Sequence, residues 1–444
     1  MARLKKILKL FFLTLIILIA ILTLGRMVQK YLDSQFTGVR GPYLQMLGSD
    51  RVTIRWQSLD ASTGQINYGS GQELVHSVKE SEAVESHELQ LKGLQSSTRY
   101  NYQIVGSKKV EWFVTAPDVT DDKAVRLWVQ GDPGYYRKET QSVKNQAMHW
   151  MEAHPRGTRP PFDLWLTTGD NAYKSGKQKE FQSALFDAYP ELLPHYPYWP
   201  AYGNHDARRW SFFKNFTFPE AGELGGAPSG TEHYFSFNYG QLHLIYLDTE
   251  TESLAPNDDM ALWLKKDLFQ NRNPWVIAVF HHPPYTKGGH NSDDTWEGLG
   301  DKSWDSLGRM VDVRENILPI LEAGGVDMVL SGHSHVYERS FQLHGHYGFS
   351  SSLTEAMVID RDNCLTKGMG TNYLVIGSSA KSDSGSLDHP VMKFSTSKRG
   401  SQVIDVESGK LTSTFIAEDG TVLDQFMILD ETHGKKEGSL GCPL

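Results

Sequence analysis

The hydrophobic and polar positions along this chain follow three successive patterns, and each predicts a different part of the molecule. Residues 7–24 are almost wholly apolar. Between residues 38 and 118 apolar and polar side chains alternate, as in residues 51–56 and 98–105, which is the period of half-buried strands. Glycines separate these runs, where turns need them. This second pattern predicts a small all-β sandwich over residues 38–118.

After a polar linker at residues 115–122, apolar runs alternate with helix-like segments. Strands are expected at residues 125–129, 164–166, 242–247, 276–280 and 328–330, and helices at 139–153, 180–189 and 313–323. Alternating strands and helices predict a layered α/β domain over residues 122–430, in which functional sites form at the carboxyl ends of strands. Residues 431–444 are expected to be a loose tail.

The apolar segment within residues 1–30 has a length between that of a signal-peptide core and that of a full membrane span of about 20 residues. Three basic residues precede it, Lys9 lies near its start and two basic residues follow it, which places the N-terminus in the cytoplasm and the rest of the chain on the far side. The nearest candidate cleavage site, at residues 23–25, fits the small-x-small pattern poorly. We favour an uncleaved membrane anchor; a cleaved signal is the alternative. Either exports the body to the periplasm or the extracellular space.

Composition narrows the possible functions. The chain has 444 residues, which is enough for two domains. Its composition, with 39% hydrophobic and 22% charged residues, indicates a globular protein. The net charge is −9, and residues 1–30 carry +6, so the rest of the chain carries −15. Such an acidic body argues against general nucleic-acid binding, although a small anion could still bind beside metal cations. Cys364 and Cys442 could form one disulfide or remain two unrelated thiols.

Five short blocks that follow apolar runs contain candidate metal ligands. They are Gly131-Asp132-Pro133-Gly134, Gly169-Asp170-Asn171-Ala172-Tyr173, Gly203-Asn204-His205-Asp206, His281-His282-Pro283 and Gly332-His333-Ser334-His335. Carboxylate, phenol, amide and imidazole groups suit hard or borderline cations. Singly, each residue could be a turn, cap or core residue. Together the blocks predict one pocket for two metal ions. If the strands that precede the blocks share one sheet, their ends bring all five blocks to one edge of that sheet.

The order of these blocks resembles that of the metallophosphoesterases: GDxG, GDxxY, GNHD, His-x-Pro and GHxH. Tyr173, the run from His333 to Arg339 and the segment 274–277 narrow the resemblance to purple acid phosphatases. Residues 41–45 match the start of the fibronectin type III-like domain that these enzymes carry. The resemblance covers roughly residues 40 to 430. It implies an α/β fold, with a metallophosphoesterase β-sandwich flanked by helices after the small all-β domain.

The resemblance also implies a division of the ligands. Asp132, Tyr173 and His335 would bind one metal, Asn204, His281 and His333 the other, and Asp170 would bridge them. Two-metal sites typically hold their ions about 3.5–4 Å apart, a distance that one carboxylate can span. A phenolate suits Fe(III), and the second ion would be divalent iron, zinc or manganese. His281 has the spacing to Pro283 and Tyr285 that the family pattern requires, whereas the adjacent His282 would be its variable position.

A metal-bound hydroxide would then attack the phosphorus of a phosphate monoester. His205 is the expected proton donor to the leaving oxygen, with Asp206 orienting its ring, and His290 is a second candidate by resemblance. The alternative roles are a structural hydrogen bond for His205 and a solvent-exposed loop position for His290.

Other functions remain to be weighed. A phosphodiesterase or nucleotide pyrophosphatase would use the same site, and the choice depends on the walls of the pocket, to which residues 291–308 and either Tyr135 or Tyr136 are expected to contribute. A surface-binding protein with an inactive site would have lost ligands, but all seven are present. A metal-independent hydrolase would need a block such as GxSxG, and none is found with the context of a triad. The sequence therefore predicts a phosphoric ester hydrolase for small phosphorylated substrates, with its oligomeric state open.

Overall fold

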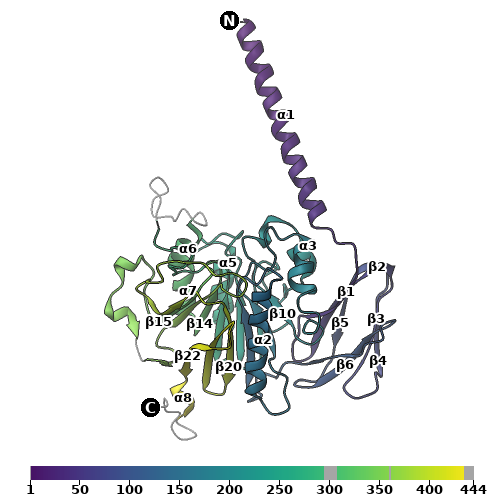
Figure 1. Cartoon of the computed structure of the whole chain (residues 1–444), viewed down its shortest axis with the longest axis vertical. Coiled ribbons are helices and arrows are strands. Elements are labelled where there is room, and N and C mark those ends of the chain that lie inside the picture. Colours follow the sequence, from purple (N-terminus) through teal and green to yellow (C-terminus); the bar gives the residue numbers. More distant parts are fainter. Residues whose placement is uncertain (1, 295–307, 360–361, 435–444) are drawn as a thin grey trace.

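The computed structural model describes residues 2–294, 308–359 and 362–434, and they form three parts in chain order. Helix α1 (Ala2–Asp33) projects from the body with its apolar side chains exposed (Figure 1). Among the described residues it is the one helix long and apolar enough to cross a membrane, a test that a signal sequence also passes. The apolar segment is therefore helical as expected, and its retention as an anchor stays a prediction.

The second part is all-β, as the alternating pattern predicts. Its seven strands form two antiparallel sheets. The first has the order β1 (Arg40–Gln45), β2 (Arg51–Ser62) and β5 (Val84–Lys92), and the second has the order β4 (His76–Lys79), β3 (Gln65–Gly69), β6 (Arg99–Ile104) and β7 (Glu111–Val114). The likeness to fibronectin type III and the domain limits of 38–118 and 122–430 stay predictions.

The third part is the mixed α/β fold expected from the sequence, built on two large sheets. One has the order β10 (Tyr198–Pro200), β9 (Leu164–Thr167), β8 (Val125–Gln130), β20 (Gly400–Glu407), β21 (Lys410–Ala417), β22 (Val422–Leu429) and β17 (Cys364–Thr366). The other has the order β11 (Phe235–Tyr239), β12 (Leu242–Tyr246), β13 (Trp275–Val279), β14 (Met328–Ser331), β18 (Thr371–Ile376), β15 (Tyr337–Leu343) and β16 (Val358–Ile359), with β19 (Met392–Thr396) paired to β15.

Strand β13 illustrates why the sheets are layered. Trp275, Ile277 and Val279 belong to the core that also contains β8 and β9, whereas Val276 and Ala278 belong to a second core beneath helices. Successive side chains of a strand point to opposite faces, so a strand that is apolar at every position must be covered on both sides. The apolar run at 276–280 is therefore the mark of a strand between two layers.

Helices cover the outer faces. Helix α2 (Lys138–Ala153) packs on β20 and β21, and α5 (Asp259–Gln270) packs beside α7 (Leu318–Ala323) over the other sheet. The expected helix at 139–153 is α2. The one expected at 180–189 is divided between α3 (Gln178–Phe181) and the π-helical turn η1 (Gln182–Phe186), and the one at 313–323 between the π-helical turn η4 (Val313–Ile317) and α7. Shorter helices are η2 (Asp206–Arg208), α4 (Phe212–Asn215), α6 (Arg309–Asp312), η5 (Ser350–Ser352), η6 (Glu355–Met357) and α8 (Glu431–Gly434).

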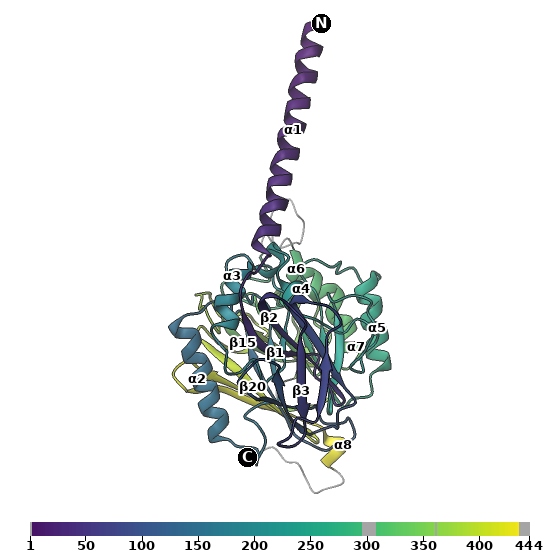
Figure 2. The same cartoon turned by 90° about the vertical axis from the view of Figure 1, so that its right-hand side faces the viewer.

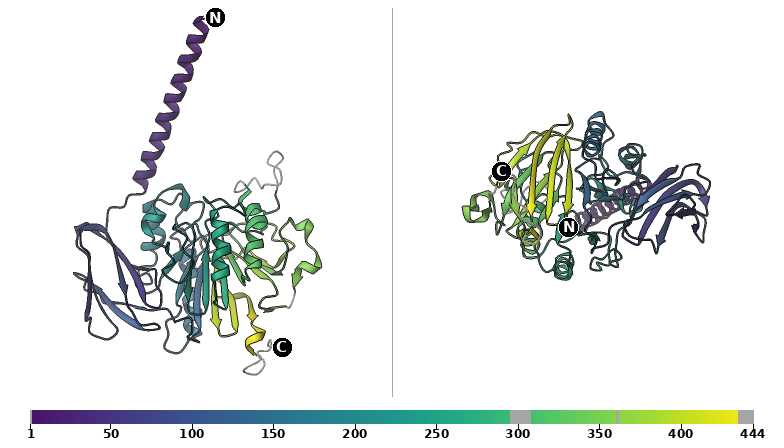
Figure 3. Two further views of the ribbon diagram at one scale, coloured as in Figure 1. Left: turned by 180° about the vertical axis from the view of Figure 1, so that it is seen from behind. Right: turned by 90° about the horizontal axis from the view of Figure 1, so that it is seen from below.

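The all-β part is docked on the α/β part, as the views from behind and below also show (Figure 3). Arg40 donates to the side chains of Gln178 and Asn215, at 2.9 and 2.8 Å. The hydroxyl of Tyr102 donates to the carbonyl of Pro194 at 2.9 Å. Through Arg40 of β1 and Tyr102 of β6, these buried polar contacts hold both small sheets against segments of the α/β part that flank β10.

The expectation that all five blocks follow strands of one sheet is wrong. Strands β8, β9 and β10 lie in one sheet, whereas β13 and β14 lie in the other. The blocks still meet, because the two sheets pack face to face through one core and the parallel strands of each run toward the same end of the molecule. The Cys442 half of the possible disulfide and the tail beyond Gly434 lie outside the described residues.

Candidate metal centre

The seven candidate ligands lie directly after the carboxyl ends of strands. Asp132 follows β8, Asp170 and Tyr173 follow β9, and Asn204 follows β10 in the first sheet. His281 follows β13 in the second sheet, and His333 and His335 follow β14. The structure brings all seven side chains together in one cluster, in which Asn204 and His335 are half-buried and the other five are buried.

One half of the cluster consists of Asp132, Tyr173 and His335. The Tyr173 hydroxyl donates to Asp132 Oδ2 at 3.0 Å and lies 3.1 Å from His335 Nε2. The distance from His335 Nε2 to Asp132 Oδ2 is 3.5 Å. These three donors therefore face a common point.

The other half consists of Asn204, His281 and His333. His281 Nε2 lies 3.1 Å from Asn204 Oδ1 and 3.2 Å from His333 Nδ1. Asp170 Oδ1 lies 3.6 Å from the same His281 nitrogen, and oxygens of Asp132 and Asp170 lie within 4.8 Å of it and of one another. Asp170 therefore lies where a carboxylate can reach both halves.

The backbone of this cluster is strained at three of the ligands. Asp132, Asp170 and His333 have φ angles of 52°, 54° and 67°, in the left-handed region that side chains with a Cβ seldom adopt. Such strain costs of order 1–3 kcal/mol for each residue and concentrates at functional sites. It indicates that the fold holds these side chains in place for a purpose other than stability.

The electrostatics of the cluster favour a bound cation. Burial opposes ionisation of Asp132, but its contact with His335 and the surrounding imidazoles hold the pKa of this carboxyl below its usual range. Burial alone would lower the pKa of His335. The contacts of its ring with Asp132 and Asp383 outweigh burial and raise this pKa to about 9. Burial and the two carboxylates raise the pKa of Tyr173 well above its ordinary value, so a neighbouring cation is needed to ionise this phenol.

His281 rather than His282 belongs to the cluster. The ring of His282 lies with Nδ1 3.0 Å from Thr249 Oγ1 and Nε2 3.5 Å from a carboxylate oxygen of Glu250. These contacts occupy the ring nitrogens of His282 away from Asn204. The ring placement agrees with His281 as the candidate ligand, and its role as a ligand stays a prediction.

His205 lies at the edge of the cluster, but Asp206 does not orient it as expected. His205 Nδ1 is 2.6 Å from the carbonyl of Lys174, and Nε2 is 3.9 Å from Asp170 Oδ2. Asp206 is buried and instead accepts hydrogen bonds from the backbone of Asn171 and Gly203. Burial and the nearby Asp170 raise the pKa of Asp206 to about 7. Asp206 therefore ties the second block to the third and holds the loops in place.

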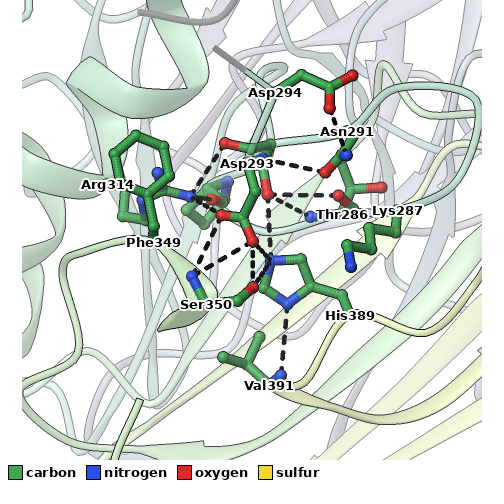
Figure 4. A network of polar contacts seen from close by, with 12 residues as sticks. Thr286, Lys287, Asn291, Asp293, Asp294, Arg314, Phe349, Ser350, His389 and Val391 are labelled. Atoms are coloured by element: carbon green, nitrogen blue, oxygen red, sulfur yellow. Dashed lines mark hydrogen bonds and ion pairs between the residues drawn. The ribbon is translucent and has the colours of Figure 1, made fainter. Parts of the chain in front are cut away.

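His290 also reaches the cluster, with its ring stacked on that of His333 at a centroid distance of 4.1 Å. A buried network fastens the loop that carries it (Figure 4). Arg314 Nη1 donates to the carbonyls of Pro284 and Ser292 at 3.3 and 3.2 Å and pairs with Asp293 at 3.3 Å. One guanidinium therefore holds both ends of the loop from 284 to 292. Residues 295–307 of the expected pocket wall lie outside the described residues.

Lys381 and Asp383 complete the site and were missed from the sequence. Lys381 Nζ lies 3.5 Å from the ring centroid of Tyr173, facing the two central carboxylates, and Asp383 contacts His335 Nδ1. Burial lowers the pKa of Lys381. Both follow the end of β18. The expectation that functional residues follow the carboxyl ends of strands would have identified them if this strand had been recognised in the sequence. The expected crowding is present as well: Tyr135 stacks on Tyr173 at 4.7 Å.

Residues 337–339 connect the strand after the fifth block to its surroundings. Arg339 pairs with Asp424 at 2.7 Å, and the Tyr337 hydroxyl donates to the same carboxylate. Glu338 accepts hydrogen bonds from the Thr286 hydroxyl and the Lys287 backbone. These contacts link β15 to β22 and to the loop of His290.

Comparisons with known proteins agree with this geometry. Residues 125–337 match the calcineurin-like phosphoesterase family. The chain is 23% identical over 322 residues to probable purple acid phosphatase 20 of Arabidopsis thaliana, covering 67% of this chain and 68% of that protein. It is 24% identical over 320 residues to purple acid phosphatase 18 of the same plant, covering 67% and 65%.

Among solved structures, purple acid phosphatase PPD1 from yellow lupin seeds has the same fold, with a TM-score of 0.66 at 17% identity, over 91% of this chain and 76% of that one. The fold of PhoD is similar, with a TM-score of 0.58 at 14% identity, over 90% and 92%. Residues 125–337 are therefore a calcineurin-like phosphoesterase domain, and the chain is a homologue of the purple acid phosphatases.

Proposed function

We propose that this chain is a phosphatase of small phosphate monoesters that works with two metal ions. Asp132, Tyr173 and His335 would hold one ion, Asn204, His281 and His333 the other, and Asp170 would bridge them. The observation that supports this is the division of the donor atoms into two groups, with spacings of 3.0–3.5 Å in the first and 3.1–3.2 Å in the second. The phenol suits Fe(III), and the amide with two imidazoles suits divalent iron, zinc or manganese.

When bound, the ions supply Lewis acidity toward phosphoryl oxygens and toward a water molecule. The chain's own residues supply the rest. His205 and His290 flank the centre on opposite halves, beside Asp170 and His333, and either can deliver a proton to the departing oxygen. The ammonium of Lys381 lies beside Tyr173 and can bind an oxygen of the phosphate. Tyr135 forms one wall of the entrance.

We also propose that α1 remains attached and anchors an exported enzyme. The helix continues without interruption for 32 residues, past the end of the apolar run, and its last turn is bound to the body. Asp33 pairs with Arg209 and Lys177 there. If the helix is not cleaved at residues 23–25, these contacts fasten its foot to the body.

The test uses the purified full chain. We expect two metal ions per chain, a visible absorption band if a phenolate binds Fe(III), and hydrolysis of p-nitrophenyl phosphate that a chelator abolishes. Asp170→Asn should lose at least about a hundredfold in kcat, since a bridging ligand positions both ions. Asp187→Asn, at an exposed position on the turn after η1, is the matched control and should keep full activity.

Three results would contradict the proposal. Full activity of Asp170→Asn would remove the bridging role. Faster hydrolysis of bis(p-nitrophenyl) phosphate than of the monoester would instead assign the chain to the phosphodiesterases. A chain that binds metal but hydrolyses neither ester would be a binding protein.

A further inference from the structure

The foot of α1 is attached to the same two loops that carry Tyr173 and His205. Asp33 Oδ2 lies 2.8 Å from Arg209 Nε and 3.2 Å from Lys177 Nζ. Lys177 follows Tyr173 by four residues, and Arg209 follows His205 by four. A chain spans at most about 3.6 Å per residue, so each attachment lies within roughly 15 Å of a residue of the centre.

The end of the body from which α1 rises is also the end that bears the site. The views in Figures 1 and 2 place α3 and α6 at that end, with α4 labelled there in Figure 2, and α8 at the opposite end. If residues 7–24 lie in the hydrocarbon layer, Asp33 lies nine residues or about 14 Å beyond it along the helix. The headgroup region itself is about 5–8 Å thick on each side. The entrance therefore lies close to the lipid headgroups.

The side chains of this end suit an anionic lipid surface, although the body as a whole is acidic. Exposed or half-exposed cations surround the entrance: Arg137, Lys138, Lys174, Arg208 and Lys381. Arg208 donates to the carbonyl of Lys174, the same carbonyl that contacts His205. Basic residues near a membrane of anionic lipids are attracted to its surface.

Two acids of these loops, Glu180 and Asp383, are already engaged by neighbouring groups. Glu180 accepts from the backbone N–H groups of Lys174, Ser175 and Lys177, and Asp383 contacts His335. Two aromatic side chains project from the same loops, since Tyr136 is 54% exposed and Trp210 is 44% exposed. Such rings are enriched at the level of lipid headgroups.

We propose that the entrance faces the bilayer in which α1 is anchored and that the enzyme takes phosphate monoesters carried on membrane lipids. This inference rests on the proposed phosphatase function and on the proposed anchor. The anchor supplies the substrate at high local concentration, and the basic and aromatic residues orient the entrance toward the surface.

The experiment places the full chain in phosphatidylcholine vesicles that contain a small fraction of phosphatidic acid. Release of phosphate from the lipid is compared with hydrolysis of p-nitrophenyl phosphate by the same vesicles. We expect both esters to be hydrolysed. A spacer of 18 helix-forming residues inserted after Arg26 lengthens α1 by about 27 Å and five whole turns, which preserves the orientation of its foot. We expect it to lower lipid hydrolysis at least about tenfold, with hydrolysis of the soluble ester unchanged.

A second variant tests the surface without changing the helix. Tyr136→Glu with Trp210→Glu should lower hydrolysis of the lipid several-fold and leave that of the soluble ester unchanged. Phe269→Glu is the matched control, because Phe269 is 80% exposed at the end of α5 that precedes β13, away from the entrance. It should change neither rate.

The outcomes separate the inference from the function on which it rests. Hydrolysis of the soluble ester alone would overturn the inference and leave the phosphatase function standing, whereas hydrolysis of neither ester would overturn both. Equal lipid hydrolysis with and without the spacer would overturn the inference. So would failure of the full chain to float with the vesicles.

Discussion

Replacing Arg314 with methionine should both destabilise the protein and slow its reaction. Removing one partner of a buried ion pair costs about 3–5 kcal/mol, because the other charge is left in a medium of low polarity. The Arg314 side chain has no exposed surface, and that of Asp293 is 16% exposed. This residual contact with water reduces the expected loss to about 3 kcal/mol. Methionine keeps most of the volume beside the Phe349 ring, which lies 4.8 Å from the guanidinium.

The assay is equilibrium unfolding in urea, followed by tryptophan fluorescence. Arg272→Met is the matched control, since Arg272 is exposed and contacts only nearby backbone carbonyls, and it should change stability by less than about 0.5 kcal/mol. The double variant Asp293→Asn with Arg314→Met should lose less than the sum of the two single variants, because it leaves no unpaired charge.

The same variant should lower kcat, because Arg314 holds both ends of the loop that carries His290. Two results would refute this reasoning. One is an unfolding midpoint of Arg314→Met equal to that of the unmodified protein. The other is strict additivity of the two single variants in the double variant.

Three further predictions concern other parts of the site. Lys381→Met should raise KM for p-nitrophenyl phosphate roughly tenfold or more without changing the metal content, since a charge-assisted hydrogen bond contributes about 1.5–3 kcal/mol. Burial raises the pKa of Glu338 from 4.5 to about 7, so its contribution to stability is full below pH 4.5 and is lost as the pH rises through 7. In the unmodified protein this group should lower the unfolding free energy by about 3 kcal/mol between pH 4.5 and 8, and in Glu338→Gln this decrease should be absent. Urea unfolding at the two pH values measures the difference. Gly169→Ala should release metal and destabilise the protein by at least about 2 kcal/mol, because φ at Gly169 is +103° and the new Cβ would lie 2.4 Å from His281 Nδ1. The control Gly157→Ala has a φ of +64° but open space around the new Cβ, so this variant should keep its metal.

The cluster of candidate ligands could be predicted from the sequence because each candidate stands beside a signal that is encoded locally. A run of apolar residues ends, a glycine or a second histidine follows, and the ligand stands beside it. The choice of His281 over His282 used the spacing to Pro283 and Tyr285 that the family pattern implies. In contrast, the partner of each strand is not encoded locally, since apolar alternation gives the faces of a strand and not its neighbours. Strand β20 pairs with β8 although more than 270 residues separate them.

The residues that were missed or misassigned depend on such distant contacts. Lys381 follows β18, a strand that was not among those expected from the sequence. Asp206 stands next to His205 in sequence, but the turn at η2 directs its carboxylate to the second block, where it accepts from Asn171. The expected contact between Asp206 and the His205 ring assumed that adjacent residues point the same way, but the turn directs their side chains to different neighbours.

The glycines of the blocks have a role that the sequence alone does not reveal. Their missing side chains make room for the blocks of other strands, so the five blocks interlock. A Cβ on Gly169 would meet His281 Nδ1 at 2.4 Å, one on Gly203 the backbone nitrogen of Asp170 at 2.3 Å, and one on Gly332 Asp132 Oδ1 at 2.4 Å. After Gly169 and Gly332, as after Gly131, the next residue takes a left-handed conformation. The pairing of glycine with a ligand is therefore a condition for packing several loops around one point. It follows that a substitution at one of these glycines should displace a ligand that belongs to a different block, which is why the blocks are informative together and ambiguous one at a time.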